Sequence, residues 1–539
     1  MITALIVFLI TYVFVGLTQV PRIPINRPAG ALVGAVLMVV TGVLTLDQAF
    51  SAIDMHTLLL LLGMMIITVY LRTAGFFELM AERILSVART PQQLLVLVSL
   101  ASALLSALFV NDTICLLFTP ILLEVTIQAG VNPLPYLLAL ATASNIGSVM
   151  TITGNPQNML IGIASGIPYL SFLQALAPVA AIGIAVSIAV IRLVYRREIT
   201  SQPFSRRAQV SPVAVDRPLL IKSLIVSGGV LVLFSLGHPY PLVAVAGAVA
   251  LMLVGKKSTE QILEGVDWTL LLFFAGLFIV MHGVEVSGLA EVLLRQAGAL
   301  NEASPINRIA GLSLVSAVLS NVVSNVPAVM LLRPLVNALG GDQIAWLTLA
   351  MSSTLAGNFT LIGSVANLIV LQQARKRVTI GFFEYFRVGA LITVITIAAG
   401  ILVLVVGTRT ARGEEQPAQM RTLTVSPAGG GTQRNYRIVL VCTTEKEKAK
   451  GLQGFRKLAS DEAALFRFDP PESTTFWMAS VSYPIDILFV EQGGSVVRTY
   501  HDRRPGSREL YPSGGPVTWV IETAGGSGIK QGDRVTISP

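Results

Sequence analysis

Long apolar runs, separated by short polar connections, dominate the chain up to Gly407. A membrane-spanning helix needs about 20 mostly apolar residues, so these runs predict spanning helices, the shorter of which extend into mixed flanks. The runs are Ile2–Val20, Ala29–Leu46, Leu58–Tyr70, Phe172–Tyr195, Ile221–Gly237, Pro241–Gly255, Thr269–His282 and Val388–Gly407.

Other apolar stretches of the same region contain polar interruptions. Two of them, Leu94–Gln128 and Ile309–Leu335, are long and have polar tips, "FVNDT" and "VSNVP". Two more, "NIGSVMTITGNPQN" and "AGNFTLIGSVAN", carry glycine, proline and asparagine. Glycine and proline break or kink a helical pattern. The long stretches therefore predict hairpins, and the short ones predict helices that unwind within the membrane.

The pattern changes after Gly407. The segment "RTARGEEQPAQMRTLTVSPAGGGTQ" is polar and rich in glycine and proline, which predicts a linker over residues 408–435. Short β-type runs follow, such as "YRIVLV", "IDILFV" and "VTWVIE", with turns such as "PSGGP" between them. Residues 436–539 are therefore predicted to form a small soluble β-rich domain.

Composition agrees with a membrane protein. The 539 residues are 53% hydrophobic and 13% charged, against about 25% charged in an average soluble protein. The chain shows no Walker motif, zincin helix or nucleophile elbow, so we expect neither an enzyme nor a cofactor. Cys115 and Cys442 fall in different parts of the chain, so we expect no disulfide and no metal cluster.

The membrane part repeats itself. "TAGFFELM" resembles "VSGLAEVL", "LSALFVNDT" resembles "LSNVVSNV", and "TITGNPQN" resembles "TLIGSVAN", in the same order and at nearly constant spacing. The alignment pairs Asp112 with Asn325, although a one-residue slip leaves this pairing uncertain by one position. Duplication predicts a first repeat over residues 1–195, a cytoplasmic linker over 196–220 and a second repeat over 221–407.

The two halves are predicted to be inverted relative to each other. Each has five segments that could span the membrane and one hairpin that re-enters it, giving ten transmembrane helices and two re-entrant hairpins. Cytoplasmic loops are enriched in Lys and Arg. With Arg192–Lys222 placed in the cytoplasm, only Arg295 and Arg308 fall on the other side. The net charge of +8 then reflects topology and not nucleic-acid binding, and both the N-terminus and the β-rich domain are extracytoplasmic.

Unwound backbone at membrane depth is tolerated only where it lines a protein cavity. Inverted repeats with discontinuous helices are typical of secondary transporters, which hold substrate and coupling ion near the midplane. Helix N-termini at the hairpin tips suit an anion, and amide or carbonyl oxygens suit Na⁺. The candidate substrate-binding residues are Asn111, Asp112, Thr113, Asn155, Pro156, Asn158, Ser324, Asn325 and Asn367, and the candidate coupling-ion residues are Asp112, Asn145, Gly147, Asn325, Asn358, Thr360 and Gly363.

Asp112 is the leading candidate, because an ionisable group at membrane depth costs about 3 kcal/mol or more and usually has a function. It either binds Na⁺, carries a proton or caps the hairpin. Arg333, in the second hairpin, either helps to hold an anion or extends its charge to the membrane surface.

At "NDT" and "GNPQN" the chain resembles the ion transporter superfamily of citrate and dicarboxylate permeases, arsenite permeases and Na⁺/H⁺ antiporters. The resemblance implies an elevator-type homodimeric carrier in the lipid bilayer of the bacterial inner membrane. Asn111, Asp112 and Thr113 would bind substrate and the first ion with Gly147, and the second tip would act with Asn358 and Thr360. Asp112 replaces the Asn of the symporters, which favours coupling through a carboxylate.

The C-terminal region resembles a bacterial domain of unknown function, number 192. The segments that carry the resemblance are "GLQGF", "FWMAS", "PIDILFVE", "YPSGGP" and "GIKQGDRV". This resemblance implies a fold only. His501 and Asp502 form an isolated pair that is too small for a metal site and is expected in a solvated turn.

Three functions remain open. The first is a secondary transporter for a small carboxylate or oxyanion driven by Na⁺ or H⁺. The second is a Na⁺/H⁺ antiporter with Asp112 as the exchange site, or an arsenite-type efflux permease. The third, from another class, is an envelope sensor whose membrane part only anchors the tail. The sensor predicts that deletion of the tail abolishes function and that Asp112→Asn is silent.

Overall fold

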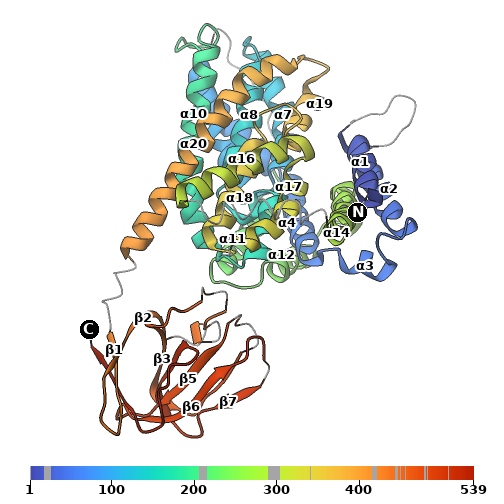
Figure 1. Cartoon of the computed structure of the whole chain (residues 1–539). Helices are drawn as coiled ribbons and strands as arrows, with labels where there is room; N and C mark the ends of the chain where they lie inside the picture. Colours follow the sequence, from blue (N-terminus) through green and yellow to red (C-terminus); the bar gives the residue numbers. More distant parts are fainter. Residues whose placement is uncertain are drawn as a thin grey trace. The chain divides into compact units, whose positions relative to one another are not determined.

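The computed structural model describes residues 2–16, 26–204, 215–288, 304–339, 341–414, 422–443, 447–448, 451–453, 455, 457–478, 481, 483–507 and 509–538. The chain forms two compact units, Met1–Thr408 and Arg409–Pro539 (Figure 1). Arg206 and Arg207 of the predicted cytoplasmic linker, and Arg295 on the predicted opposite side, lie outside the described residues.

The first unit is helical. Its first half contains α1 (Ile2–Gly16), α2 (Arg27–Val40), α3 (Leu46–Ser51), α4 (Met55–Thr73), α5 (Phe76–Val87), α6 (Pro91–Leu108), α7 (Asn111–Gln128), α8 (Leu134–Ser148), a 3₁₀ turn (Ile152–Gly154), α9 (Pro156–Ser165) and α10 (Tyr169–Val194). Its second half contains α11 (Arg217–Ser235), α12 (Tyr240–Val254), α13 (Thr259–Glu264), α14 (Trp268–Val286), α16 (Pro305–Val323), α17 (Asn325–Ala338), α18 (Gln343–Ala356), α19 (Val365–Ala374) and α20 (Phe382–Glu414).

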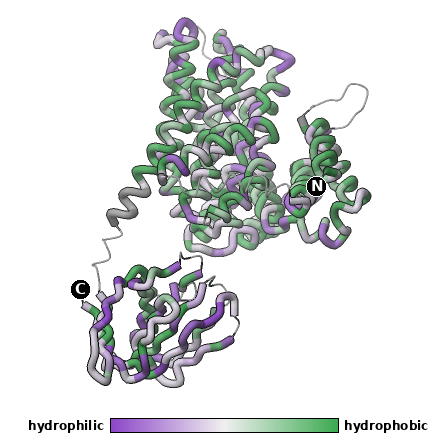
Figure 2. The backbone as a smooth tube through the Cα atoms, in the orientation of Figure 1, coloured by the Kyte–Doolittle hydropathy of each residue, from purple (hydrophilic) through white to green (hydrophobic). Residues whose placement is uncertain are grey.

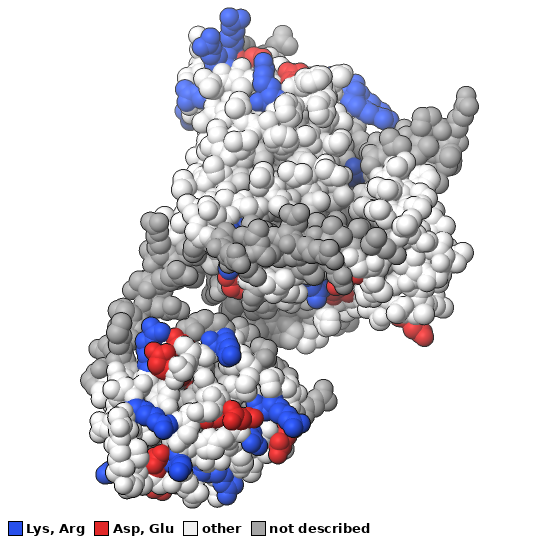
Figure 3. All heavy atoms as spheres, in the orientation of Figure 1, with Lys and Arg blue, Asp and Glu red and all other residues white. Residues whose placement is uncertain are grey.

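Among the described residues, 7 helices are long and apolar enough to cross a membrane. Figure 2 shows the helical unit as largely hydrophobic, and Figure 3 shows a broad uncharged band on its visible face. Helices α4, α10, α11, α14 and α20 account for five of the ten predicted spans. The shorter apolar helices α1, α2 and α12 and the interrupted pairs α8–α9 and α18–α19 account for the others. The predicted polytopic helical fold is confirmed.

Both predicted hairpins are present. Phe109 and Val110 alone separate α6 from α7, and Ser324, with φ of 72°, alone separates α16 from α17. In each hairpin the two helices pack against one another. Fully buried serines line the first arms, where small residues allow close approach to a neighbouring helix; they are Ser99, Ser102 and Ser106 on α6, and Ser313, Ser316 and Ser320 on α16.

Helix pairing reveals an internal two-fold relation. Helix α2 packs on α14 while α4 packs on α12, and α7 packs on α19 while α17 packs on α9. Each pair becomes the other when the halves are exchanged. The equivalence of Ser106 with Ser320 also corrects the alignment at the tips, because it pairs Asn111, and not Asp112, with Asn325. Asn111 and Asn325 are both the first residues of their helices.

Two predicted linkers are shorter in the structure. Helix α11 begins at Arg217, inside the expected 196–220 linker, because the Asp216 side chain accepts a hydrogen bond from the N–H of Leu219 and caps the helix. The expected 408–435 linker is wrong at both ends: α20 continues to Glu414, and β1 (Thr422–Ser426) is already part of the sheet. Its "SPAGGG" stretch connects two paired strands.

The second unit contains a 7-stranded sheet with the order β6-β5-β8-β3-β2-β1-β9, and a 2-stranded sheet of β4 and β7. Strands β1 and β2 are antiparallel neighbours, whereas β2 and β3 are parallel. Buried apolar residues fill both faces of the larger sheet. The remaining strands are β2 (Arg434–Cys442), β3 (Glu462–Glu472), β4 (Thr475–Trp477), β5 (Ile485–Val490), β6 (Val496–Arg503), β7 (Leu510–Pro512), β8 (Val517–Ala524) and β9 (Arg534–Ser538).

Asp486 is the buried polar centre of this unit. Its carboxylate accepts hydrogen bonds from the N–H groups of Asp502 and Ser527, both at 2.8 Å, and lies 3.0 Å from Nδ1 of His501. Burial alone would raise the pKa of Asp486, but these hydrogen bonds outweigh burial and hold the pKa below its usual value. His501 is therefore paired with Asp486, which corrects the expectation of an isolated pair in a solvated turn.

Replacing Glu522 with glutamine is expected to stabilise the β unit relative to the wild type increasingly as pH rises above about 5. The Glu522 side chain is buried, its Oε2 has no hydrogen-bond partner in the described part of the β unit, and burial raises its pKa to about 8. The unfolded carboxyl has a pKa of about 4.3. Folding therefore holds a proton that the unfolded chain releases, and stability falls as pH rises from about 5 to about 8. Glutamine carries no such proton.

Hydrogen exchange of β8 in the full chain measures this difference. At pH 9 the amides of β8 should exchange more slowly in Glu522→Gln than in the wild type, and at pH 5 the two should match. Comparing both proteins at the same pH removes the intrinsic pH dependence of exchange. Equal protection at pH 9 would contradict the buried, unpartnered carboxyl.

Candidate functional site

Two asparagines stabilise the break between α8 and α9. Asn155 caps α9, because its Oδ1 accepts a hydrogen bond of 2.8 Å from the N–H of Asn158. The Nδ2 of Asn158 in turn donates to the carbonyls of Ser148 and Thr151, both at 3.0 Å. The backbone carbonyls at the break between α8 and α9 thus accept hydrogen bonds from a side chain. Such pairing is required inside a membrane, because lipid offers no hydrogen-bond partners.

The break between α18 and α19 is stabilised in the same way. Ser364 caps α19 through its Oγ, which accepts from the N–H of Ala366. The Nδ2 of Asn367 donates to the carbonyls of Gly357 at 2.7 Å and Thr360 at 3.2 Å. Ser364, Asn367, Gly357 and Thr360 occupy in the second repeat the positions of Asn155, Asn158, Ser148 and Thr151 in the first. The predicted relation of the two breaks is therefore visible in their hydrogen bonds.

Asn145, near the end of α8, joins the two halves. Its Nδ2 donates to Oδ1 of Asn358 at 2.8 Å and to Oδ1 of Asn367 at 3.1 Å. Its Oδ1 accepts from Nδ2 of Asn111 and from Oγ of Ser364, both at 3.0 Å. One fully buried amide thus connects the first hairpin tip, α8 and the second break.

Thr354 is the counterpart of Asn145 in the second repeat. Its hydroxyl donates to Oδ1 of Asn158 at 3.4 Å and accepts from Nε2 of Gln157 at 3.1 Å and Nδ2 of Asn155 at 3.4 Å. In each half, the end of the helix before the break, α8 or α18, therefore forms hydrogen bonds with the break of the other half. We call the connected polar residues the amide cluster: Asn111, Asn145, Asn155, Gln157, Asn158, Thr354, Asn358, Ser364 and Asn367, together with Asn325 at the second tip.

The two tips contribute one unsatisfied oxygen each. Asn111 and Asn325 are 4% and 7% exposed, and their buried Oδ1 atoms have no hydrogen-bond partner among the residues that the structure describes. Nearly all buried polar atoms are hydrogen-bonded, so each exception calls for an explanation. An amide oxygen is an acceptor. Two equivalent unsatisfied acceptors are suited to bind cations or the donor groups of a ligand.

Helix termini set the electrostatics of the amide cluster. Helices α7, α9, α17 and α19 all begin at or beside its residues. Free N–H groups and partial positive charge at such ends attract anions. Among the described residues of the amide cluster, every side chain is an uncharged amide or hydroxyl. The arrangement therefore offers donors to an anion and oxygens to a cation, without a fixed charge.

Asp112 does not belong to the amide cluster. It lines a separate cavity of about 90 Å³, together with Thr113 of α7, Arg72 of α4 and Asp267 at the start of α14. The structure therefore divides the predicted "NDT" group: Asn111 reaches the amide cluster, whereas Asp112 and Thr113 face the helices that pack beside the hairpin.

Other predicted residues support the backbone. Pro156 is the first residue of α9, and Ser324 forms the turn between α16 and α17. Thr360 donates its hydroxyl to Oδ1 of Asn321 at 3.1 Å. A side chain at Gly363 would approach the same oxygen to 2.9 Å. The sequence analysis did not identify four of the residues found here: Asn321, Ser364, Thr354 and Gln157. Of these, Ser364 occupies the repeat position of Asn155 and could have been found from the alignment of the repeats.

Substitution of Gly147 by alanine is expected to destabilise the helical unit. A Cβ at Gly147 would lie 2.1 Å from the backbone oxygen of Ala103 on α6, so the hairpin would have to move away from α8. Overpacking of this kind costs about 1–3 kcal/mol. The matched control is Gly228→Ala on α11, where a Cβ meets nothing within 4 Å. Thermal unfolding should distinguish them, and equal melting temperatures would contradict the packing.

The comparisons with known proteins place the chain among membrane transporters. Residues 6–356 match the family model described as "Citrate transporter", and residues 429–537 match that of an uncharacterized domain, number 192. The silicon efflux transporter of Oryza sativa subsp. japonica is 31% identical over 71% of this chain and 93% of its own length. An uncharacterized transporter of Mycobacterium bovis is 34% identical over 75% and 97%.

Two further likenesses are more distant. The arsenical pump membrane protein of Escherichia coli is 26% identical over 68% of this chain and 92% of its own length. The crystal structure of the Alcanivorax borkumensis YdaH transporter matches with a TM-score of 0.50 and 14% identity, over 76% of this chain and 97% of that chain; this match supports the fold alone. Through its helical unit the chain belongs to the citrate transporter family of membrane transporters, and it carries a domain of unknown function 192 at its C-terminal end.

Proposed function

We propose that the chain is a secondary active transporter that moves a small oxyanion or carboxylate across the membrane, coupled to Na⁺ or H⁺. The observation that carries the proposal is the amide cluster, in which Asn145 joins both halves and Asn111 and Asn325 each leave a buried oxygen unpaired. The N-termini of four helices would hold the anion, and the unpaired amide oxygens would hold the coupling cation.

The packing of the helices favours an elevator-type mechanism. The hairpins and interrupted helices contact one another through α6–α8, α7–α19, α9–α17 and α16–α18. Helices α2, α4, α12 and α14 pair among themselves as a second group. A unit that carries the amide cluster could move against such a frame as one body. The proposed homodimer would form through the frame.

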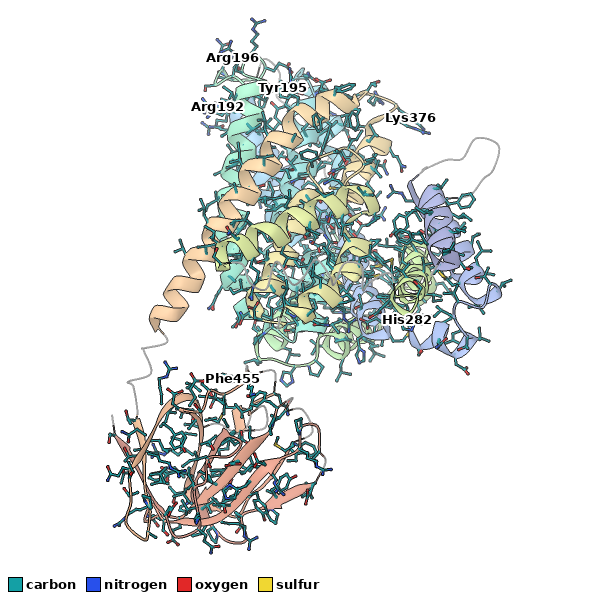
Figure 4. The ribbon with its side chains drawn as sticks, viewed as in Figure 1. Arg192, Tyr195, Arg196, His282, Lys376 and Phe455 are labelled. Carbon is teal, nitrogen blue, oxygen red and sulfur yellow. The ribbon has the colours of Figure 1, made fainter. Side chains whose placement is uncertain are left out.

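The distribution of basic residues favours the predicted orientation. Arg192, Arg196 and Lys376 lie toward one end of the helical unit, away from His282 (Figure 4). Lys and Arg also gather at that end on the visible face (Figure 3). Because cytoplasmic loops are rich in both residues, this end would face the cytoplasm of a bacterial cell. The N-terminus and the β unit would then be extracytoplasmic.

A second candidate is efflux of a neutral oxyacid, as an arsenite-type permease would perform. Its supporting observation is the lack of a charged side chain among the described residues of the amide cluster. Relatives named for silicon and arsenical transport add to it. A Na⁺/H⁺ antiporter that uses Asp112 and no organic or oxyanion substrate is the third.

Flux into proteoliposomes tests these alternatives. Arsenite, silicate, citrate and succinate should be offered in turn, each with an imposed Na⁺ gradient, pH gradient or neither. The proposal expects one anion to accumulate only when one gradient is present. Gradient-driven proton movement with no anion present would favour the antiporter. Accumulation of silicate or arsenite at pH values where the acid is neutral would favour the oxyacid permease.

A further inference from the structure

Two cavities in the helical unit are built from equivalent helices. The larger, about 540 Å³, lies between α14 and α17 and also touches α3 and α9. The smaller, about 90 Å³, lies between α4 and α7 and touches α19 and the residues that follow α13. The internal two-fold relation exchanges α4 with α14, α7 with α17, α9 with α19 and α3 with α13. The two cavities therefore occupy the same place in the two repeats.

The lining residues confirm this equivalence position by position. Along the α4 and α14 walls, Met65, Val69 and Arg72 of the smaller cavity stand where Phe278, His282 and Glu285 of the larger one stand, at constant spacing along the chain. In an inverted repeat, equivalent places open toward opposite membrane faces. By this symmetry the two cavities, which we call the larger and the smaller vestibule, would open toward opposite membrane faces, and they differ in volume.

The charges of the two vestibules differ. The larger contains Arg333, which is exposed and forms no ion pair with any residue that the structure describes. Its other ionisable groups, His282 and Glu285, lie 3.6 Å apart. The smaller vestibule contains two carboxylates, Asp112 and Asp267, and one cation, Arg72. The larger vestibule therefore holds one arginine and one carboxylate, whereas in the smaller two carboxylates outnumber one arginine, so the larger is the less negative of the two.

Charged side chains among the apolar helices of a membrane protein are rare and usually have a function. A cleft with apolar walls focuses the field of its charges and concentrates counter-ions. The walls here include Phe278, Met281 and Met330. We propose that the larger cavity is an anion-loading vestibule in which Arg333 binds a small carboxylate or oxyanion before it reaches the hairpin tips. This inference rests on the proposed anion transport and adds a site outside the amide cluster.

Charged thiol reagents measure the potential in this vestibule without any need for transport. Asn337 lines the cavity and is exposed, so Asn337→Cys places a thiol beside Arg333. The native Cys115 and Cys442 are 0% and 2% exposed, and the parent chain should not react. The experiment compares the rates at which the introduced thiol reacts with the anionic sulfonatoethyl and the cationic trimethylammonium-ethyl methanethiosulfonates, in the full chain in sealed vesicles.

The anionic reagent is expected to react faster than the cationic one, relative to their rates with a free thiol. Arg333→Gln should lower this preference about tenfold, which is the lower end of the effect of a charged cleft on association, whereas Arg333→Lys should keep most of it. Glu285→Gln should raise the preference, because it removes the opposing charge. An unchanged preference in Arg333→Gln would overturn the proposal, and so would an introduced thiol that reacts with neither reagent.

Sidedness tests the equivalence of the two cavities. Leu270 lines the smaller one, and the thiol of Leu270→Cys should react from the membrane face opposite to that of the Asn337→Cys thiol; reaction of both from one face would overturn the vestibule assignment. The outcomes are separable from those of the proposed function. A chain that labels as expected but carries no anion would refute the transport proposal alone, whereas anion transport with no Arg333-dependent preference would refute the vestibule alone.

Discussion

Replacement of Asn145 by alanine is expected to abolish transport and to lower the unfolding temperature of the helical unit markedly. The side chain makes four hydrogen bonds of 2.8 to 3.1 Å to Asn111, Asn358, Ser364 and Asn367. Its loss leaves buried groups on both halves without partners, at about 1–3 kcal/mol for each group that stays unpaired. The total should reach about 3 kcal/mol or more, in the range of the most damaging single substitutions.

Asn132→Ala provides a matched control. Asn132 also makes two side-chain hydrogen bonds, to Glu198 and to the N–H of Leu134, but it is exposed. Water replaces such bonds, so the control should change stability by less than about 1 kcal/mol and leave transport intact. Thermal unfolding and flux should be measured on both variants. A loss of stability and flux in Asn145→Ala alone would show that the effect comes from the amide cluster and not from removal of any asparagine side chain. Wild-type flux in Asn145→Ala would refute the central role of Asn145.

Asp112→Asn is expected to leave the fold intact and to remove gradient-driven accumulation. Asparagine has nearly the same shape, and Asp112 lines a cavity instead of bonding within the amide cluster. The substitution therefore removes a charge and a titratable proton without opening a void. Because Asp112 follows Asn111 in the first turn of α7, a change in its charge would alter the electrostatic potential at the tip that holds the unpaired oxygen.

The measurement is anion flux into proteoliposomes under an imposed Na⁺ or pH gradient, with the unfolding temperature as the check on folding. The control is Asp47→Asn in α3, an exposed carboxylate that should be silent in both assays. Equilibration of the anion without accumulation in Asp112→Asn would indicate uncoupling, as expected. Accumulation at the wild-type level would remove Asp112 from the coupling mechanism.

The pattern of polar interruptions was enough to predict both hairpins and both broken helices. These features follow from rules that act locally: Gly and Pro stop a helix, and unpaired backbone at membrane depth needs polar neighbours. The "GNPQN" segment also predicted that Asn155 and Asn158 would serve the break, and the structure shows the bonds they make. The order of the repeats, and hence the fold class, came from the same segments.

The direction of individual side chains could not be predicted. Asn111 and Asp112 are neighbours on a helix, so they point about 100° apart, and only one of them can face the amide cluster. A sequence alignment with a one-residue slip could not decide which one. Gly147 was predicted as an ion ligand, yet the structure gives it a packing role against Ala103 that depends on a contact distant in the sequence.

The predicted linker failed for a related reason. "SPAGGG" has the composition of a flexible connection, but such residues also form the turn of a strand pair. Strand β1 is short, and only its pairing with β2 and β9 identifies it. Asp486 likewise lies within an apolar strand, and its role depends on N–H groups from Asp502 and Ser527 that the fold brings together.

A cryo-electron microscopy map of the full chain in nanodiscs, with its transported anion and coupling ion at saturating concentration, tests the central claim most directly. The account predicts density for the anion between the two hairpin tips, within hydrogen-bonding distance of Asn145 or its partners, and density for a cation or water at Oδ1 of Asn111 and of Asn325. The account would be contradicted by a map in which the ligand lies elsewhere and no density for a cation or water lies at the Oδ1 atoms of Asn111 and Asn325.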